Sequence, residues 1–304
     1  MYRREFVALP AAGVALVLGL DETPVTGRLS LTDVDRIKER IGRLAAHFTA
    51  VGGELYPVAA GYLTRLRRTA DHCTYGPRAE NALYEAVSDL SSSTAWAALD
   101  AGHRGEARLL FADALQSAIL AGDGRGQARA WSNVALQLRT EGRLRESLRV
   151  TRAALDTRQA RHDPLIAALL HARHAITYAQ VADGRAVARE LLAAEQAYDR
   201  ADSAPRPSWL RFLTPAELSG LAAIAHRDLG HLADAELATA QALDLLAPSM
   251  RRSRSYYRVQ LAELQLAQGD LDRAAVTAAS VDAAPGSRTI TERLAAVHRT
   301  LATT

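Results

Sequence analysis

The chain has little cysteine, lysine or phenylalanine. Cys73 is the one cysteine in 304 residues, which excludes an intrachain disulfide framework and a zinc site built on paired cysteines. Lys38 is the one lysine, so the positive charge is almost entirely arginine, and the net charge is only +3. The arginines alternate with acidic residues instead of gathering with aromatic ones, so we expect no direct binding of nucleic acid.

The signatures of common enzyme classes are also missing. The sequence contains no glycine-rich phosphate loop, no His-Glu-x-x-His, no Gly-x-Ser-x-Gly and no protein-kinase set. Cys73 follows His72, but no base with an orienting group accompanies it, so we interpret it as an ordinary thiol. The sequence therefore favours a binding protein over an enzyme and indicates no cofactor.

Long hydrophobic runs are absent. The apolar stretch from Val7 to Leu20 is interrupted by Pro10 and Gly13 and is too short to span a bilayer. Arg3-Arg4 ahead of it resembles a twin-arginine export signal, although no clean small-x-small cleavage site follows. We expect a cytoplasmic protein without membrane contact, with export as the alternative.

Alanine and leucine dominate what is present, together with arginine, glutamine and glutamate. These residues lose least on entering a helix, while phenylalanine, at 4, and β-branched runs are scarce. The composition predicts an all-α fold. Two helices are expected at 31–51 and 55–68, the first capped by Ser30 or Thr32 and ended by Gly52-Gly53.

One pattern recurs along the chain: an alanine-rich helix, a turn with glycine, and a small residue five positions later. Glycine adopts the left-handed conformation that ends a helix, and the small residue lets the next helix pack closely. A single hairpin cannot bury its apolar face, so neighbours must stack. The copies are Gly102 with Ala107, Gly142 with Ser147, Gly230 with Ala235, and Gly269 with Ala274, while Gly184 with Ala188 supplies a fifth turn offset by one residue.

The second copy resembles a tetratricopeptide repeat. Its matching residues are Trp131, Val134, Ala135, Leu138, Gly142, Ser147 and Ala154. The resemblance covers about residues 86–284 and implies a right-handed superhelical solenoid of stacked antiparallel hairpins. We therefore divide the chain into an apolar segment or linker at 1–28, capping helices at 29–85, and helical repeats with a C-terminal capping helix at 86–304.

The Arg-Arg-x-Phe start followed by helical repeats is similar to the effector region of actinomycete-type helix-turn-helix regulators. That resemblance implies a regulatory module without its DNA-binding head. It would accept a peptide, a small metabolite or a partner protein in its concave groove and control gene expression, as a monomer or a homodimer. The alternatives are a secondary-metabolism enzyme that uses the groove as its active site, and a protein–protein scaffold.

In tetratricopeptide arrays the first helix of each pair lines the groove, and the resemblance transfers that role to residues here. The expected groove residues are Trp96, Arg129, Ser132, Glu217, Arg227, Tyr256 and Glu263, and in the third copy either Arg173 or the set His171, His174 and Tyr178.

The third-copy set has spacings of three and four, which place its side chains on one helical face. With Glu217 it would supply acid–base groups to an enzyme. A metal site would need a third ligand from His162, His226 or Glu217. None of these three residues lies at a sequence spacing typical of a metal-binding motif, so we predict no metal site.

Overall fold

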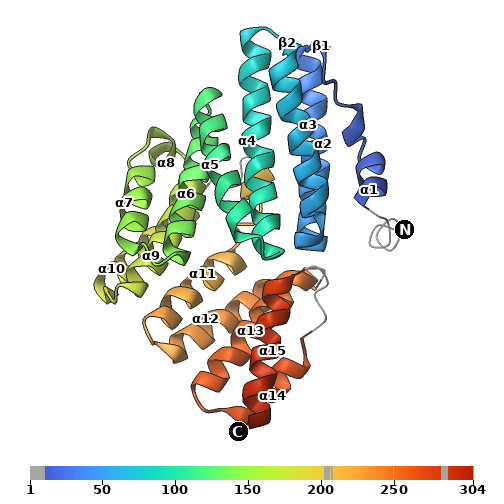
Figure 1. Cartoon of the computed structure of the whole chain (residues 1–304). Helices are drawn as coiled ribbons and strands as arrows, with labels where there is room; N and C mark the ends of the chain where they lie inside the picture. Colours follow the sequence, from blue (N-terminus) through green and yellow to red (C-terminus); the bar gives the residue numbers. More distant parts are fainter. Residues whose placement is uncertain (1–10, 202–205, 207, 249, 282–286, 304) are drawn as a thin grey trace. The chain divides into compact units, whose positions relative to one another are not determined.

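The computed structural model describes residues 11–201, 206, 208–248, 250–281 and 287–303. Arg3-Arg4, the proposed export signal, lies outside this part. The described chain is helical except for one short parallel strand pair, β1 (Gly27–Arg28) with β2 (Cys73–Thr74) (Figure 1). The predicted all-α class is confirmed, with helices packed as sequential pairs.

Contacts divide the chain into two compact units, a first unit of residues 1–130 and 285–288 and a second unit of residues 131–284 and 289–304. The first unit contains α1 (Ala11–Val17), the 3₁₀ segments η2 (Leu20–Glu22) and η3 (Gly52–Leu55), α2 (Leu31–Val51), α3 (Tyr56–His72), α4 (Pro77–Asp100) and α5 (Arg104–Leu120). Helix α6 (Gly124–Thr140) crosses the division. The second unit contains α7 (Leu144–Leu155), α8 (Arg158–His162), α9 (Pro164–Gln180), α10 (Gly184–Asp199), η4 (Ser208–Leu210), α11 (Pro215–Asp228), α12 (Leu232–Leu245), α13 (Arg251–Ala267), α14 (Leu271–Ala279) and most of α15 (Arg288–Thr303).

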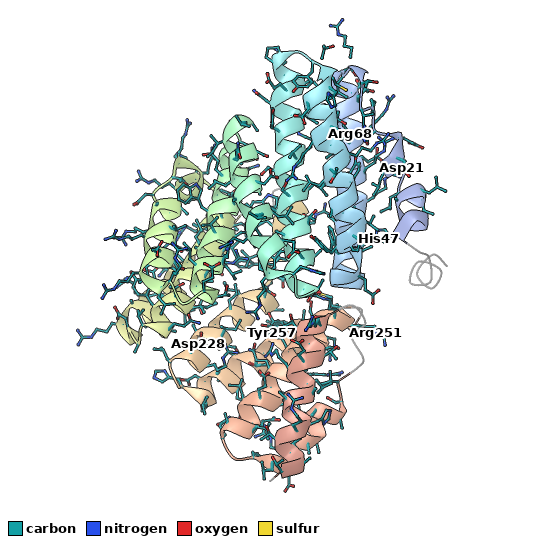
Figure 2. The ribbon with its side chains drawn as sticks, in the orientation of Figure 1. Asp21, His47, Arg68, Asp228, Arg251 and Tyr257 are labelled. Atoms are coloured by element: carbon teal, nitrogen blue, oxygen red, sulfur yellow. The ribbon has the colours of Figure 1, made fainter. Side chains whose placement is uncertain are left out.

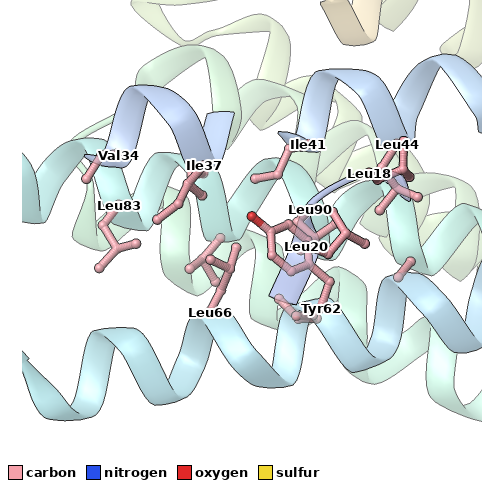
Figure 3. Close-up of a cluster of buried hydrophobic side chains, with 14 of the residues drawn as sticks. Leu18, Leu20, Val34, Ile37, Ile41, Leu44, Tyr62, Leu66, Leu83 and Leu90 are labelled. Atoms are coloured by element: carbon pink, nitrogen blue, oxygen red, sulfur yellow. The ribbon is translucent and has the colours of Figure 1, made fainter. Parts of the chain in front are cut away.

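The first unit has a continuous apolar core between α2, α3 and α4 (Figure 3). Val34, Ile37, Ile41 and Leu44 repeat every three or four residues along α2, so one face of the helix is apolar and buried. Leu20, from the segment before α2, lies in the same core. The described part of the 1–28 segment therefore packs onto the helices that follow it.

Helix α2 begins and ends as the sequence predicts. The Ser30 side chain accepts from the Asp33 N–H while the Asp33 carboxylate accepts from the Ser30 N–H, which forms a capping box. Gly52 ends the helix at φ +68°. The predicted helix at 55–68 is confirmed as α3, which extends to His72.

Four of the five predicted hairpin turns have their glycine at positive φ, at residues 102, 142, 230 and 269. The prediction for the fifth is wrong, because Gly184 is the first residue of α10 and the left-handed position is Ala182, at φ +58°. With Ala182 as the turn residue, the buried Val187 stands five positions later, as in the other copies. The apparent offset of the third copy is thus a change of residue type and not of register.

Within the second unit, α9 pairs with α10, α11 with α12, and α13 with α14, and α9 also packs on α11. The predicted C-terminal capping helix is α15, which buries Val297 against Ala262 of α13 and Ala278 of α14. Arg293 of α15 forms a forked ion pair with Glu263 of α13, at 2.8 and 2.6 Å.

Candidate functional site

Several expected groove residues lie between the first helices of consecutive hairpins. Arg129 of α6 is buried, and its guanidinium donates to Asp89 Oδ1 of α4 at 2.8 Å and to Ser93 Oγ at 3.1 Å. Burial lowers the pKa of Arg129, and the charge of Asp89 opposes that effect. In this position Arg129 fixes α6 against α4.

Arg173 of α9 has the same kind of role against α6. Its Nη1 atom donates to Ser132 Oγ at 2.7 Å and to Asn133 Oδ1 at 3.2 Å, and all three residues are buried. Ser132 and Arg173, two residues predicted to face a groove, therefore bind each other.

Glu217 of α11 accepts a hydrogen bond from the Tyr257 hydroxyl of α13 at 2.9 Å. Burial raises the pKa of the Glu217 carboxyl, and the hydrogen bond from Tyr257 opposes the rise. Tyr257 is buried, and Figure 2 labels its position on α13. The sequence analysis predicted neither Tyr257 nor Asp89. Tyr257 stands next to the predicted residue Tyr256, and Asp89 shares the register of the predicted residues Arg129 and Glu217.

A common register was the available signal. Asp89, Arg129 and Glu217 each lie 13 residues before the positive-φ glycine of their hairpin, at 102, 142 and 230. In a repeat protein the first helices of neighbouring hairpins pack against each other. A charged residue recurs at this position of the first helix. Such a position predicts a contact between neighbouring repeats, since a buried charge must find a partner.

The two histidines of the third copy meet a residue that the sequence did not indicate. Glu190 of α10 is buried, and its Oε2 atom accepts hydrogen bonds from the Nδ1 atoms of His171, at 2.7 Å, and His174, at 3.3 Å. Burial alone would raise the pKa of Glu190, but the hydrogen bonds with His171 and His174 hold it well below its usual range. Arg189 adds a contact to the other carboxylate oxygen, at 3.2 Å.

Tyr178 completes this cluster by ring contacts. Its ring centroid lies 4.5 Å from that of His174, and the Arg189 guanidinium lies 5.9 Å from it. The Nε2 atom of His174 is buried and has no hydrogen-bond partner in the described part of the chain. His171 keeps partial exposure while its Nδ1 is held by a carboxylate, which is an arrangement used in acid–base catalysis.

Of the other four expected residues, Glu263 forms the ion pair with Arg293 described above, and the remaining three are partly exposed. Trp96 of α4 makes an edge-to-face contact with Phe111 of α5, at 5.9 Å between centroids. Arg227 of α11 pairs with the adjacent Asp228 at 2.7 Å, and the Tyr256 ring of α13 lies 4.7 Å from the Arg293 guanidinium.

An open groove of about 650 Å³ lies elsewhere in the second unit, along the second helices α10 and α12 with α11 at its base. Leu191, Glu195, Tyr198 and Asp199 line it from α10, Leu218, Ser219, Ala222 and His226 from α11, and Asp234, Leu237, Ala238 and Gln241 from α12, with Ala194 and Pro215 between them. None of the predicted site residues lines this groove.

The groove combines apolar side chains with negative charge. Leu237 is 61% exposed although it is a large apolar residue, and Leu191 faces the groove from the other side. Glu195, Asp199 and Asp234 add three carboxylates, and no arginine is among the lining residues. At one end, His226 and Asp234 lie with His231 and offer two imidazoles and a carboxylate to a cation.

Cys73 is not part of either site. It is buried in β2, and burial raises the pKa of its thiol, so the thiolate is disfavoured. No helix in the described residues is long and apolar enough to cross a bilayer.

No family model and no curated protein sequence matches this chain. Solved structures with a similar arrangement include BtubC (BKLC) from P. vanneervenii, with a TM-score of 0.47 and 17% identity over 81% of this chain and 91% of that chain. Another is the APC/C hetero-tetramer Cut9–Hcn1, with a TM-score of 0.44 and 12% identity over 96% of this chain and 54% of that chain. Both similarities are too distant to assign a function. The fold itself is established by the helix pairs: the chain is an all-α protein of sequentially packed helix pairs.

Proposed function

We propose that this protein is a non-catalytic binding module that holds a basic, amphipathic segment of a partner protein in the α10–α11–α12 groove. The observation that carries the proposal is the composition of the groove wall, where exposed Leu237 lies among the carboxylates of Glu195, Asp199 and Asp234. Exposed apolar residues grouped in a groove are typical of an interaction surface.

The charge of the groove wall indicates which kind of segment binds there. The chain carries 37 lysines and arginines against 34 acidic residues, yet the groove wall contains three acidic residues and no lysine or arginine. A segment with arginine or lysine on one face and leucine-like residues on the other would complement both features. Small anionic metabolites would be repelled by the same wall.

Selection from a random peptide library tests this proposal. Peptides enriched on the full chain should carry net positive charge and apolar residues at helical spacing, and their binding should weaken as salt rises. Leu237→Ser and the pair Glu195→Gln with Asp199→Asn should each abolish the enrichment. Leu109→Ser is the matched control, because Leu109 is similarly exposed, at 68%, but lies on α5. Enrichment of neutral or acidic peptides, or of none, would contradict the proposal.

A regulatory role belongs to the same proposal, supported by the sequence resemblance to effector regions of helix-turn-helix regulators. In that role the occupied groove would change the activity of a DNA-binding partner in the cytoplasm. Reporter expression in the source organism should change in Leu237→Ser and stay unchanged in Leu109→Ser.

Acid–base catalysis is a second candidate, favoured by the contact between His171 and the buried Glu190 at 2.7 Å. It predicts a turnover that is lost when His171 and His174 are both replaced by alanine. A turnover that survives the double replacement would eliminate this candidate.

A further inference from the structure

Two histidines and one aspartate meet at the turn between α11 and α12. His226 lies in the last turn of α11, His231 precedes α12 as its N-cap, and Asp234 lies in the first turn of α12. Gly230, at φ +82°, reverses the chain, so that the His231 N–H donates to the His226 carbonyl at 2.9 Å. The two imidazoles stack with centroids 6.3 Å apart, and ligand atoms of all three side chains lie within 4.8 Å of one another.

These donor types suit a transition metal. Zinc binds imidazole nitrogen and carboxylate oxygen at about 2.0–2.2 Å in a tetrahedral site, which places neighbouring ligand atoms about 3.3 Å apart. His231 and Asp234 are exposed, so small side-chain rotations can bring them from the observed spacing to that distance. The Nδ1 atom of His226 is buried and finds no hydrogen-bond partner among the described residues. This ring nitrogen of His226 is therefore not committed to another group in the described part of the chain.

We propose that His226, His231 and Asp234 bind a divalent metal ion of the zinc class. His226 and Asp234 also line the groove, so the ion lies at one end of it. Three protein ligands leave a fourth coordination position, which water or a donor atom of the groove's occupant fills. This inference goes beyond peptide binding and does not depend on it, because the ion binds to the empty groove.

The first hairpin of the chain supplies an internal comparison. Its turn residue Gly102 is at φ +89°, and the His103 N–H donates to the Ala98 carbonyl at 2.7 Å. His103 Nδ1 lies 3.9 Å from Glu106 Oε1, as His231 Nδ1 lies 3.9 Å from Asp234 Oδ2. The two turns differ in the acidic residue, Glu106 or Asp234, and at the position of His226, where the first hairpin has Ala98. His226→Ala therefore leaves only a histidine–carboxylate pair, as in the first hairpin.

Cobalt is a suitable probe, because Co²⁺ replaces zinc and its visible absorption reports four-coordinate geometry. The full chain, without a histidine tag and stripped with a chelator, is titrated with Co²⁺ and then with competing Zn²⁺, and native mass spectrometry counts the ions. We expect one ion per chain with the four-coordinate spectrum. His226→Ala and Asp234→Asn should each weaken binding about tenfold or more, since even outer-shell losses cost this much.

His103→Ala is the matched control and should bind like the wild type. Circular dichroism of each variant separates loss of the ligand from loss of the fold. The proposal is overturned if the wild type shows no four-coordinate cobalt spectrum. It is equally overturned if folded His226→Ala retains wild-type affinity, or if His103→Ala weakens binding as much as His226→Ala does.

Discussion

Replacing Gly220 with alanine should destabilise the second unit, although alanine is normally the better helix residue. Gly220 lies inside α11, and a Cβ atom there would overlap the phenol of Tyr257 on α13. Tyr257 is only 3% exposed, so its ring cannot move out into solvent and must press on neighbouring side chains. Any displacement also breaks its 2.9 Å hydrogen bond to Glu217.

The magnitude follows from three terms. Overpacking costs about 1–3 kcal/mol, and a buried carboxyl deprived of its hydrogen bond costs about 1–3 kcal/mol. Alanine has a higher helix propensity than glycine, which offsets about 1 kcal/mol of this destabilisation. We expect a net destabilisation of about 3 kcal/mol, which is a change of about a hundredfold in the local opening equilibrium.

Gly61→Ala is the control with the opposite sign. Gly61 is an exposed glycine inside α3, and a Cβ atom there meets nothing within 4 Å. The substitution should therefore stabilise α3 by about 0.5–1 kcal/mol through the lower entropy of the unfolded chain.

Hydrogen exchange with mass spectrometry measures both effects where they arise. Peptides of α11 and α13 should exchange faster in Gly220→Ala, and peptides of α3 more slowly in Gly61→Ala. Tyr257→Leu removes the ring, so Gly220→Ala should cost less in that background, with a coupling of about 1 kcal/mol or more. Equal exchange in wild type and Gly220→Ala, or fully additive effects in the double variant, would refute the packing argument.

Three further substitutions should have measurable effects. Ala182→Gly should raise stability by about 1 kcal/mol, because its exposed left-handed backbone strains an alanine but not a glycine; calorimetry gives the melting temperature. Asp89→Asn should lower stability by about 3 kcal/mol, since it removes the charge that Asp89 places beside buried Arg129; an unchanged urea midpoint would contradict this. Glu190→Gln should lower stability at neutral pH. The folded pKa of Glu190 is depressed, so its contribution is present above the unfolded value of 4.5 and is lost as pH falls below it; the variant's acid unfolding curve should therefore be flatter there.

The fold could be predicted from sequence because it depends on local signals. The apolar stripe of α2, its Ser30 cap and the turn glycines each act within a few residues of their own position. Ala182 was misread because the backbone conformation of a turn is fixed by the helices on either side. When those helices pack well, a residue without glycine's freedom is tolerated at modest cost.

The site could not be predicted in the same way, because its contacts join residues far apart in the sequence. His171 and His174 were recognisable as one helical face, but their partner Glu190 comes from the next helix. The sequence showed His226 only as a remote donor to those histidines. The turn at Gly230 places it instead beside His231 and Asp234.

The polar side chains on the first helices fix the register in which neighbouring repeats pack. The apolar surfaces of alanine-rich helices are nearly uniform, so they pack almost equally well in several registers, whereas a buried ion pair or hydrogen bond is satisfied in one. The contacts Asp89–Arg129 and Glu217–Tyr257 would both be broken if one first helix slid by a turn against its neighbour. Buried pairs of this kind add little net stability, but they penalise alternative registers strongly. In the proposed function a ligand contacts instead Leu237 and the carboxylates of Glu195, Asp199 and Asp234, which all lie on second helices.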